Sequence, residues 1–533
     1  MITKYINGKI YVEQGRFVEA MSVEDEKIIA VGTNDEIKSS KGDTIVDLEG
    51  KTVIPGINDS HLHLYITGNA LAQLQLNGAR SIDEIVERGK KYIEENPDLS
   101  FVVGRGWNQD YFEEGEKRSV NRHDLDRIST EVPIVAERVC VHVISMNTKA
   151  LELLGWDKDK VIPGGEIYRE EDGEMLGVFT ENAAIEARSI VPQDSEEEIE
   201  KKFLLAADYA LKNGVTTVQS CDIMMADHWD PMFSVIQKIY KEKKTPMRYF
   251  PQFNFNQMDT LKEYIEKYYY QDIYDDVYQK GAIKLFKDGS LGARTALLSK
   301  PYYDDPSTKG VEAISKEDMD AFCAFAEEKR IPLLVHTIGD EAIRTVVDSY
   351  EKHFKDGKNS LRHTLVHCQI TDKPLMKRIG DLDIVVSYQP IFLEYDITMM
   401  EDRVGPELAS TSYAYHSMKN IYGAHTAYST DSPVEDLNPF PCIFSAVTRQ
   451  KTNGFPEGGF YPEERVSVED AIDSYTLESA YMEGVEDRKG RLKPGYYADF
   501  IVLDRDIFTC DPMEIKDITV EKTFVNGALA YEK

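Results

Sequence analysis

The sequence predicts an α/β protein built on a (β/α)8 TIM barrel, with a composite β-sandwich from both termini and a long insertion after barrel strand 1. Three observations lead to this fold. The middle of the chain alternates apolar runs of strand length with amphipathic charged segments, which is typical of parallel βα units. Both ends carry short apolar runs separated by turn signals. The gap after the first strand is too long for one crossover helix.

The two ends of the chain share a pattern of short apolar runs separated by turn signals. Residues 1–52 contain runs such as Ile10-Tyr11-Val12 and turn signals such as Asn7-Gly8. Residues 486–533 contain Phe500-Ile501-Val502-Leu503 and the turn signal Asn526-Gly527. Half-domains at opposite ends of a chain usually meet, so we predict one β-sandwich that flanks a barrel at residues 53–485.

Eight strands are expected in the barrel. The first is the apolar stretch that starts at Thr52 and ends near Leu64, and a helical segment at 196–211 precedes the second. Eight parallel strands close naturally into a barrel, and the segment of about residues 65–194 is then an insertion at its carboxyl-terminal mouth, where loops build active sites. The other seven strands are expected at 215–220, 247–253, 281–286, 331–336, 364–367, 384–388 and 426–429.

Charge and composition narrow the function classes. Lys+Arg number 62 and Asp+Glu 94 in 533 residues, which gives a net charge of -32. This balance repels phosphate backbones and anionic lipids, so we expect no nucleic acid and no membrane partner, although solubility alone would explain it. The six cysteines include no Cys-x-x-Cys pair, and no apolar run has signal-peptide or membrane-spanning length. We expect a cytoplasmic protein, and a homodimer is left open.

Potential metal ligands stand at the ends of the predicted strands. His61 and His63 are spaced i, i+2, which points both imidazoles to one side of a strand. Alternation in the fourth strand places Lys284 toward the barrel lumen and Lys287 on the outer face. His336, His367 and Asp431 end or follow strands five, six and eight. Several strands would thus deliver donors to one end of the barrel. The competing interpretation for Lys284 is a salt bridge to Asp288.

These motifs resemble the amidohydrolase superfamily and, within it, the amidohydrolase-3 group of N-substituted formamide deformylase-like enzymes. The resemblance covers nearly the whole chain. It rests on Pro55-Gly56-Ile57-Asn58-Asp59-Ser60-His61-Leu62-His63, on residues 283–296, on His336-Thr337-Ile338-Gly339-Asp340, on Thr430-Asp431-Ser432-Pro433-Val434 with Asn438-Pro439, and on Gly495-Tyr496-Tyr497-Ala498-Asp499.

The resemblance implies a binding site for one or two divalent ions, with zinc as the expected metal, and carbon dioxide held as a carbamate on Lys284. Physical chemistry supports the carbamate, because a lysine amine beside cations has a depressed pKa and a carbamate is an oxygen donor for metals. The implied metal ligands are His61, His63, Lys284, His336, His367 and Asp431.

The activity implied is hydrolysis of carbon–nitrogen bonds other than peptide bonds in a small-molecule amide, such as an N-acyl or N-formyl amide. Asp431 would be the catalytic general base. The resemblance also marks Trp107 and His142 as substrate-binding elements in the insertion. Trp107 could equally belong to the core. Arg294, after strand four, could clamp a substrate carboxylate or cap a loop.

Two other functions remain open. An aminohydrolase that deaminates a cyclic amidine would share the barrel and the His-x-His motif. Such enzymes typically have a glutamate three residues after the strand-five histidine, where this sequence has Gly339, and they lack a lysine in the lumen. A non-catalytic scaffold on the same fold is the second alternative. The presence of all six ligand residues argues against it.

Overall fold

The computed structural model describes residues 1–42, 44–140, 142–224, 229–271 and 273–533. These residues form two compact units. One consists of Met1–Thr67 with Ala206–Lys533, and the other of Gly68–Leu205. Helices α2 (Leu64–Ala72) and α7 (Glu196–Lys212) cross the boundaries between the units.

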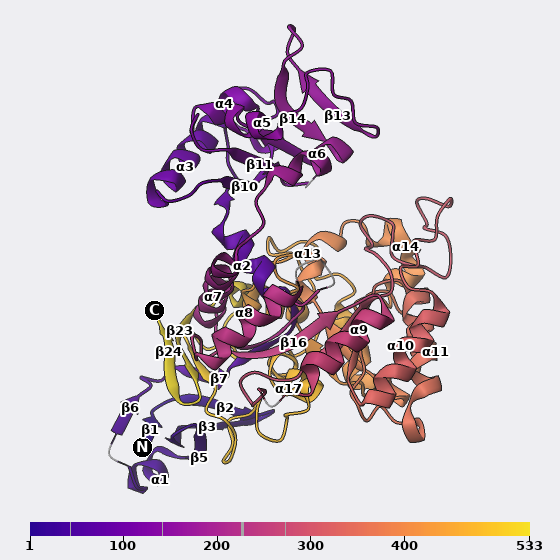
Figure 1. The fold of residues 1–533 in the computed structure, drawn as a ribbon. Coiled ribbons are helices and arrows are strands. Elements are labelled where there is room, and N and C mark those ends of the chain that lie inside the picture. The colour runs from indigo at the N-terminus through magenta and orange to yellow at the C-terminus, as the bar shows by residue number, and fades with distance from the viewer. Residues whose placement is uncertain (43, 141, 225–228, 272) are drawn as a thin grey trace. The chain divides into compact units, whose positions relative to one another are not determined.

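The first unit contains an eight-stranded parallel sheet that is nearly closed into a barrel (Figure 1). Its order is β21-β20-β19-β18-β17-β16-β15-β8, so consecutive strands of the chain are neighbours. This order confirms the predicted α/β fold with parallel βα units. The strands are β8 (Ile57–Leu62), β15 (Val215–Ser220), β16 (Arg248–Asn254), β17 (Ala282–Phe286), β18 (Leu333–Thr337), β19 (Thr364–His367), β20 (Val385–Tyr388) and β21 (Thr426–Tyr428).

The opening apolar stretch differs from the prediction of one strand. It forms two strands, β7 (Thr52–Pro55) in a terminal sheet and β8 in the barrel. Gly56 lies at the break, where a Cβ atom would stand 2.3 Å from Thr216 Oγ1. The close approach of β15 therefore requires glycine at the point where the chain passes from one sheet to the other.

Helices surround the barrel strands, and α10 shows why they form. Ser315 caps its first turn by accepting a hydrogen bond from the Asp318 amide, and Met319, Phe322 and Ala326 are buried at helical spacing. The other helices of this unit after α7 include α8 (Trp229–Lys241), α9 (Met258–Tyr264), α11 (Asp340–His353), α12 (Lys373–Asp381), α13 (Leu393–Asp396), α14 (Met400–Ala409), α15 (Pro439–Thr448), α16 (Val468–Tyr475) and α17 (Leu477–Glu483).

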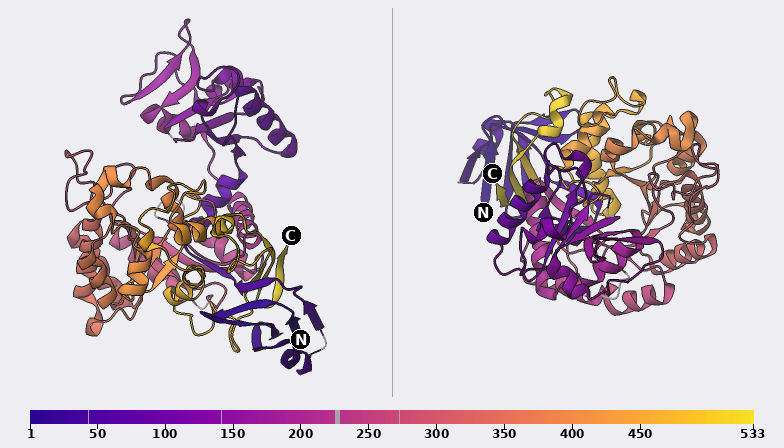
Figure 2. Two further views of the ribbon diagram at one scale, coloured as in Figure 1. Left: turned by 180° about the vertical axis from the view of Figure 1, so that it is seen from behind. Right: turned by 90° about the horizontal axis from the view of Figure 1, so that it is seen from above.

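Two terminal sheets flank the barrel in the same unit. The four-stranded sheet has the order β5-β4-β1-β6 and the six-stranded sheet has the order β24-β23-β22-β7-β2-β3. In the second sheet β7 pairs with β22, so both chain ends contribute strands to it, and the termini lie on the same side in both views of Figure 2. The strands are β1 (Ile2–Ile6), β2 (Lys9–Glu13), β3 (Arg16–Val18), β4 (Ala20–Glu24), β5 (Lys27–Gly32), β6 (Thr44–Asp47), β22 (Phe500–Leu503), β23 (Val520–Val525) and β24 (Ala528–Glu532).

Aromatic rings fill the core shared by these terminal strands. Phe500 and Phe524 stack with ring centroids 4.4 Å apart, and the Tyr5 ring meets Phe500 edge-on at 5.0 Å. All three are buried in one apolar cluster. Because these residues come from both ends of the sequence, burial of their rings ties the two ends together.

The second unit is a six-stranded sheet with helices. Its order is β13-β14-β12-β11-β10-β9. Apolar residues form two core clusters in this unit, one of which contains Trp107. The elements are β9 (Leu74–Gln75), β10 (Val102–Trp107), β11 (Ile134–Arg138), β12 (Val143–Met146), β13 (Gly165–Arg169), β14 (Met175–Thr180), α3 (Ile82–Glu95), α4 (Arg122–Asp126), α5 (Thr148–Leu154) and α6 (Glu181–Ala187).

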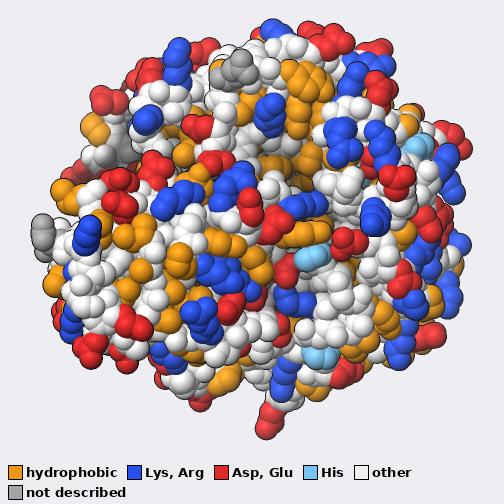
Figure 3. Space-filling model, turned by 90° about the horizontal axis from the view of Figure 1, so that it is seen from below, with side chains coloured by type: hydrophobic (Ala, Val, Ile, Leu, Met, Phe, Trp, Pro, Cys, Tyr) orange, Lys and Arg blue, Asp and Glu red, His pale blue; other side chains and the backbone are white. Residues whose placement is uncertain are grey.

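Charged groups of both signs are distributed over the surface. Figure 3 shows Lys and Arg side chains interspersed with Asp and Glu side chains on one face. Arg378 illustrates such pairing, since its Nη1 lies 2.6 Å from Asp348 Oδ1 while both side chains stay partly exposed. In the described part of the chain, no helix has both the length and the apolar character needed to cross a membrane.

A buried ion pair connects the barrel to the terminal sheet. Arg248 of β16 donates from Nε to Asp499 Oδ2 at 2.6 Å and from Nη2 to Asp499 Oδ1 at 3.2 Å. The two side chains are only 1% and 5% exposed. Removal of one partner would leave the other charge buried without compensation, which is the costly case for ion pairs.

Arg248→Met is therefore expected to lower the free energy of unfolding by about 3–5 kcal/mol. The matched control is Arg378→Met, which removes partly exposed ion pairs with Asp348 and Glu351 and should cost about 0–1 kcal/mol for each pair. Guanidinium unfolding followed by circular dichroism would measure both. Equal losses in the two variants would contradict a special role for the buried pair.

Candidate metal centre

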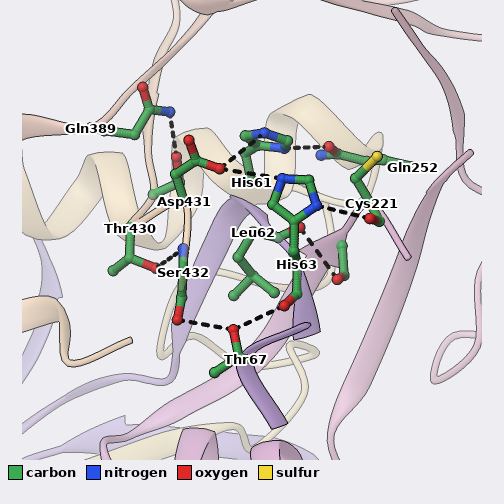
Figure 4. Close-up of polar contacts among 12 residues, drawn as sticks. His61, Leu62, His63, Thr67, Cys221, Gln252, Gln389, Thr430, Asp431 and Ser432 are labelled. Atoms are coloured by element: carbon green, nitrogen blue, oxygen red, sulfur yellow. Dashed lines mark hydrogen bonds and ion pairs between the residues drawn. The ribbon is translucent and has the colours of Figure 1, made fainter. Parts of the chain in front are cut away.

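The six predicted ligands come from five strands or from the residues that follow them, with His61 and His63 both at the end of β8, and they lie at one end of the barrel. The closest set is His61, His63 and Asp431 (Figure 4). Asp431 Oδ1 lies 3.4 Å from His61 Nε2 and 3.5 Å from His63 Nε2. One ligand atom from each residue falls within 4.8 Å of the other two. This spacing suits a common cation, because ligand atoms about 2 Å from one ion lie about 3–4 Å apart.

The other two histidines join the same cluster. The rings of His336 and His367 have centroids 4.4 Å apart, and the His367 ring lies 5.8 Å from the His61 ring. Strands β18 and β19 carry them, and the ladder places Thr337 opposite His367. The predicted alignment of donors at strand ends thus brings four imidazoles together.

Hydrogen bonds to two glutamines determine which ring nitrogen of His61 and of His367 carries the proton. Gln252 Nε2 donates to the Ser60 carbonyl at 2.9 Å, so its Oε1 is the atom that accepts from His61 Nδ1 at 2.6 Å. Gln389 Nε2 donates to Ser429 Oγ at 2.7 Å, and its Oε1 accepts from His367 Nδ1 at 2.6 Å. Both imidazoles therefore carry their proton on Nδ1 and keep the Nε2 lone pair for a cation.

Backbone carbonyls determine the protonated nitrogen of His63 and His336 in the same way. His63 Nδ1 donates to the Cys221 carbonyl at 2.9 Å, which leaves Nε2 free (Figure 4). His336 Nε2 donates to the Gly289 carbonyl at 3.1 Å, which leaves Nδ1 free. In its neutral form each of the four rings thus offers one lone pair, and the nitrogen it offers is set by its hydrogen-bond partner.

Burial keeps most of these imidazoles neutral. Burial lowers the pKa of His61 and His367 well below the usual range, and it lowers the pKa of His336 to about 3. Burial also opposes the charged form of His63, but the hydrogen bond with Asp431 outweighs it and raises the pKa of His63. Positive charge is thus favoured beside Asp431, while the other rings are in the neutral form that binds metals.

Lys284 is a buried amine in the same cluster. Its side chain is 0% exposed, its Nζ has no hydrogen-bond partner among the described residues, and it lies 3.8 Å from the centroid of the Phe286 ring. Burial lowers the pKa of Lys284 to about 8. The neutral, nucleophilic amine that carbamate formation requires is therefore more populated near neutral pH than in an exposed lysine.

The contacts of Asp288 and Lys287 test two alternatives, a salt bridge between Lys284 and Asp288 and the choice of Lys287 as the lysine of the site. Asp288 Oδ2 accepts from the Gly339 amide at 2.8 Å and from the Leu297 amide at 2.9 Å, and the described residues show no ion pair between Asp288 and Lys284. Lys287 Nζ instead reaches Glu312 Oε1 at 2.5 Å. These partners favour Lys284 over Lys287 as the lysine of the site.

The donor set fits a divalent cation. Lys284 Nζ is a buried amine without a hydrogen-bond partner in the described structure, and Asp431 Oδ1 is a buried carboxylate oxygen whose ion-pair contacts are with His61 and His63 Nε2 at 3.4 Å and 3.5 Å. A buried carboxylate beside imidazole lone pairs is stabilised by a cation, because buried charges are costly unless they are paired or coordinate a metal. Nitrogen and oxygen donors of this kind are the ligands that zinc and similar ions prefer.

The three predicted substrate-binding residues lie in different surroundings. Arg294 in the loop after β17 forms a two-point ion pair with Asp304, at 3.1 Å and 2.8 Å, which ties the loop together. Trp107 in the second unit is 0% exposed, and its Nε1 donates to the Ala136 carbonyl, so it packs in that unit's core. His142 is exposed in the same unit and pairs with Glu181 at 2.8 Å. Their roles toward a substrate stay predictions.

Gln252 and Gln389 are not among the site residues that the sequence predicts. A weak signal exists for Gln252, since it lies in a predicted strand at the parity of the lumen-facing Phe250. Gln389 directly follows β20, where parallel-strand loops carry functional groups. Neither position reveals which histidine the amide would meet, because that depends on the register between strands.

Gly339 is enclosed by the loop after β17. A Cβ atom at this position would lie 2.0 Å from the Leu297 carbonyl oxygen. The backbone leaves no space for any side chain, so a glutamate three residues after His336 cannot be accommodated without moving this loop.

Comparison with known proteins follows this geometry. The model of the amidohydrolase family, in its amidohydrolase-3 form, matches residues 44–531. The chain belongs to the amidohydrolase family. It is a hydrolase of the amide type, and His61, His63 and Asp431 form a group that could hold the ion of a metal-dependent hydrolase.

Relatives span nearly the full length. A candidate amidohydrolase named YtcJ from Bacillus subtilis is 32% identical over 99% of this chain and 98% of its own. N-substituted formamide deformylase from Arthrobacter pascens is 25% identical over 97% of this chain and 95% of its own. The crystal structure of an uncharacterized metal-dependent hydrolase from Pyrococcus furiosus has a TM-score of 0.78 and 29% identity, covering 96% of this chain and 100% of that one.

We expect the amidohydrolase to lose tight metal binding when His61 and His63 are both changed to Ala, because two of the three closest donors disappear. Mass spectrometry of dialysed protein would give the metal content. The control is a double change of His353 and His416 to Ala, two histidines of other elements, which should leave the metal content unchanged. Full metal content in the His61 and His63 variant would refute the assignment of the site.

Proposed function

We propose that the protein hydrolyses a carbon–nitrogen bond other than a peptide bond in a small N-acyl or N-formyl amide. The observation that carries this proposal is the donor set: four imidazoles whose protonated nitrogens are set by hydrogen bonds, the unpartnered Lys284 Nζ, and Asp431 Oδ1 beside His61 and His63. The relative named as a formamide deformylase supports the substrate class, and the neighbour described as a metal-dependent hydrolase supports the cation.

We further propose zinc as the cation and a carbamate on Lys284. Carbon dioxide would react with the neutral Nζ, forming an N–C bond with loss of one proton from nitrogen, and the new carboxylate would be an oxygen donor. Burial of Lys284 supports this step because it favours the neutral amine. The residues that would hold the ions are His61, His63, the modified Lys284, His336, His367 and Asp431.

A divalent cation bound there would supply Lewis acidity, which polarises the amide carbonyl and makes water acidic near neutral pH. Asp431 would take the proton from the attacking water at its carboxylate oxygen and deliver it to the leaving nitrogen. The water oxygen forms a bond to the carbonyl carbon, the C–N bond breaks, and the products are a carboxylic acid and an amine. The glutamines around His61 and His367 keep those rings oriented through both steps.

The deaminase alternative receives less support from the geometry. The loop carbonyl beside Gly339 occupies the space that a glutamate side chain would need. A scaffold without catalysis would give no reason to maintain an unpaired buried amine at Lys284, since it costs stability.

The direct test is a substrate panel with zinc-loaded protein. N-formyl and N-acyl amines should release amine and acid, whereas cyclic amidines should release no ammonia. Liquid chromatography with mass detection would distinguish the products. Ammonia release from cyclic amidines, with no cleavage of any amide, would reverse the preference between the two functions.

Lys284→Ala is expected to lose metal and activity, because it removes the atom that would carry the carbamate. Propionate or acetate should restore part of both by supplying a free carboxylate in the same space. Metal content and hydrolysis rate with and without the acid would be measured. Lys287→Ala is the control, and a loss of activity in it alongside full activity in Lys284→Ala would show that the wrong lysine was chosen.

Asp431→Asn keeps the size of the side chain and an oxygen atom but cannot accept the proton in the same way. General acid–base catalysis typically contributes about 10²–10⁴-fold, so turnover should fall by roughly that factor while most of the metal stays bound. Steady-state kinetics and metal analysis on the same preparation would check this. A rate within a few-fold of the parent would mean that another group moves the proton.

A further inference from the structure

The barrel is closed beside the metal centre by polar side chains. Strands β8 and β21 stand at the two ends of the sheet order, and no ladder joins them in the described sheet. We call the junction between these two strands the seam. Ser60 bridges part of this seam, since its Oγ donates to the Tyr428 carbonyl at 2.9 Å and lies 2.8 Å from Ser387 Oγ. Because the seam separates the two histidines of β8 from Asp431, its geometry sets the geometry of the ligands.

Asp59 makes the central contacts of the seam. It is 0% exposed. Its Oδ2 accepts from Thr430 Oγ1 at 2.6 Å and from the Thr430 amide at 3.1 Å. Its Oδ1 accepts from the His61 amide at 3.2 Å. The Asp59 carboxylate therefore binds the backbone of His61 and also Thr430, the residue before Asp431.

Backbone hydrogen bonds continue the seam past Asp59. The Asp431 amide donates to the His61 carbonyl at 3.0 Å, and the His63 amide donates to the Ser432 carbonyl at 2.8 Å. Asp431 itself has a φ of 57°, in the left-handed region that side chains other than glycine rarely adopt. Such a conformation persists only where surrounding contacts determine it, and the Thr430 contacts to Asp59 come directly before it.

We propose that Asp59 is the positioning residue of the metal centre, which holds Asp431 at the correct distance from His61 and His63. This inference rests on the proposed metal-dependent function. Asp59 does not touch the cation or the substrate in this role. It acts through Thr430 on one side and through the His61 backbone on the other.

The chemistry of the contacts explains why the residue must be a carboxylate. Both oxygens face only hydrogen-bond donors, namely two amides and one hydroxyl. An asparagine would have to turn an NH₂ group toward at least one of these donors. The variant Asp59→Asn thus keeps the volume of the side chain while it breaks one side of the seam.

The experiment uses protein loaded with cobalt(II) in place of zinc. Asp59→Asn should bind the ion about 10–100-fold more weakly in chelator competition, which is the usual effect of losing a residue that supports a ligand. Its visible absorption bands should shift, because the ligand geometry around the ion changes. The turnover number should fall more than the Michaelis constant rises, since Asp431 is the group displaced.

Thr430 tests the same contact from the other partner and does not depend on Asp59→Asn folding. Thr430→Ser keeps the hydroxyl donor and should retain the parent spectrum and affinity. Thr430→Val removes the donor at nearly constant volume and should behave like Asp59→Asn. This conservative rescue separates positioning from a general loss of packing.

Glu327→Gln is the matched control for the loss of a buried carboxylate. Glu327 of α10 is 3% exposed and lies 3.4 Å from His363 at the start of β19, the opposite end of the barrel strands. Its loss should change the melting temperature without changing the cobalt spectrum. The proposal is overturned if Asp59→Asn and Thr430→Val keep the parent's spectrum and cobalt affinity, or if Glu327→Gln changes both as much.

The cobalt experiment can distinguish a failure of the Asp59 proposal from a failure of the proposed function. If the parent protein binds cobalt but cleaves no amide in the panel, the proposed function fails while the spectra still decide the role of Asp59. If the parent binds no cobalt at all, both proposals fail together.

Discussion

The metal centre depends on one constraint: every buried imidazole must present a lone pair inward, and its other nitrogen must therefore donate outward. The structure meets this constraint with four different acceptors, two glutamine oxygens and two backbone carbonyls. Without them the rings could rotate or exchange tautomers, and the burial that keeps them neutral would also leave an N–H group unpaired. The hydrogen-bond partners thus determine which nitrogen of each histidine is available to a cation.

The strand-end donors could be predicted from sequence because a parallel barrel repeats simple rules. Alternation in the fourth strand was enough to place Lys284 in the lumen and Lys287 elsewhere, in agreement with their contacts. Strand boundaries at 215–220 and 364–367 coincide with β15 and β19. Periodicity carries this information because each strand is short, apolar and bounded by a polar residue.

Other features depend on contacts that periodicity does not encode. The break at Gly56 arises from the approach of Thr216, which is distant in sequence. The tautomers of His61 and His367 depend on glutamines of other strands, and the ion pair of Arg294 depends on a loop residue. Trp107 looks the same in sequence whether it binds a ligand or fills a core, and only its burial and its bond to Ala136 favour the core.

The neutrality of the four acceptors has a further consequence for chemistry. A carboxylate behind a ligating histidine raises the basicity of the ring and so donates more electron density to the ion. Amide and carbonyl oxygens do this less, so an ion held by His61, His63, His336 and His367 would keep more of its positive charge. That charge would be available to polarise a carbonyl, which is what amide hydrolysis demands, because the amide is a poor electrophile. The choice of glutamine rather than glutamate at 252 and 389 therefore fits the same reaction as the ligands themselves.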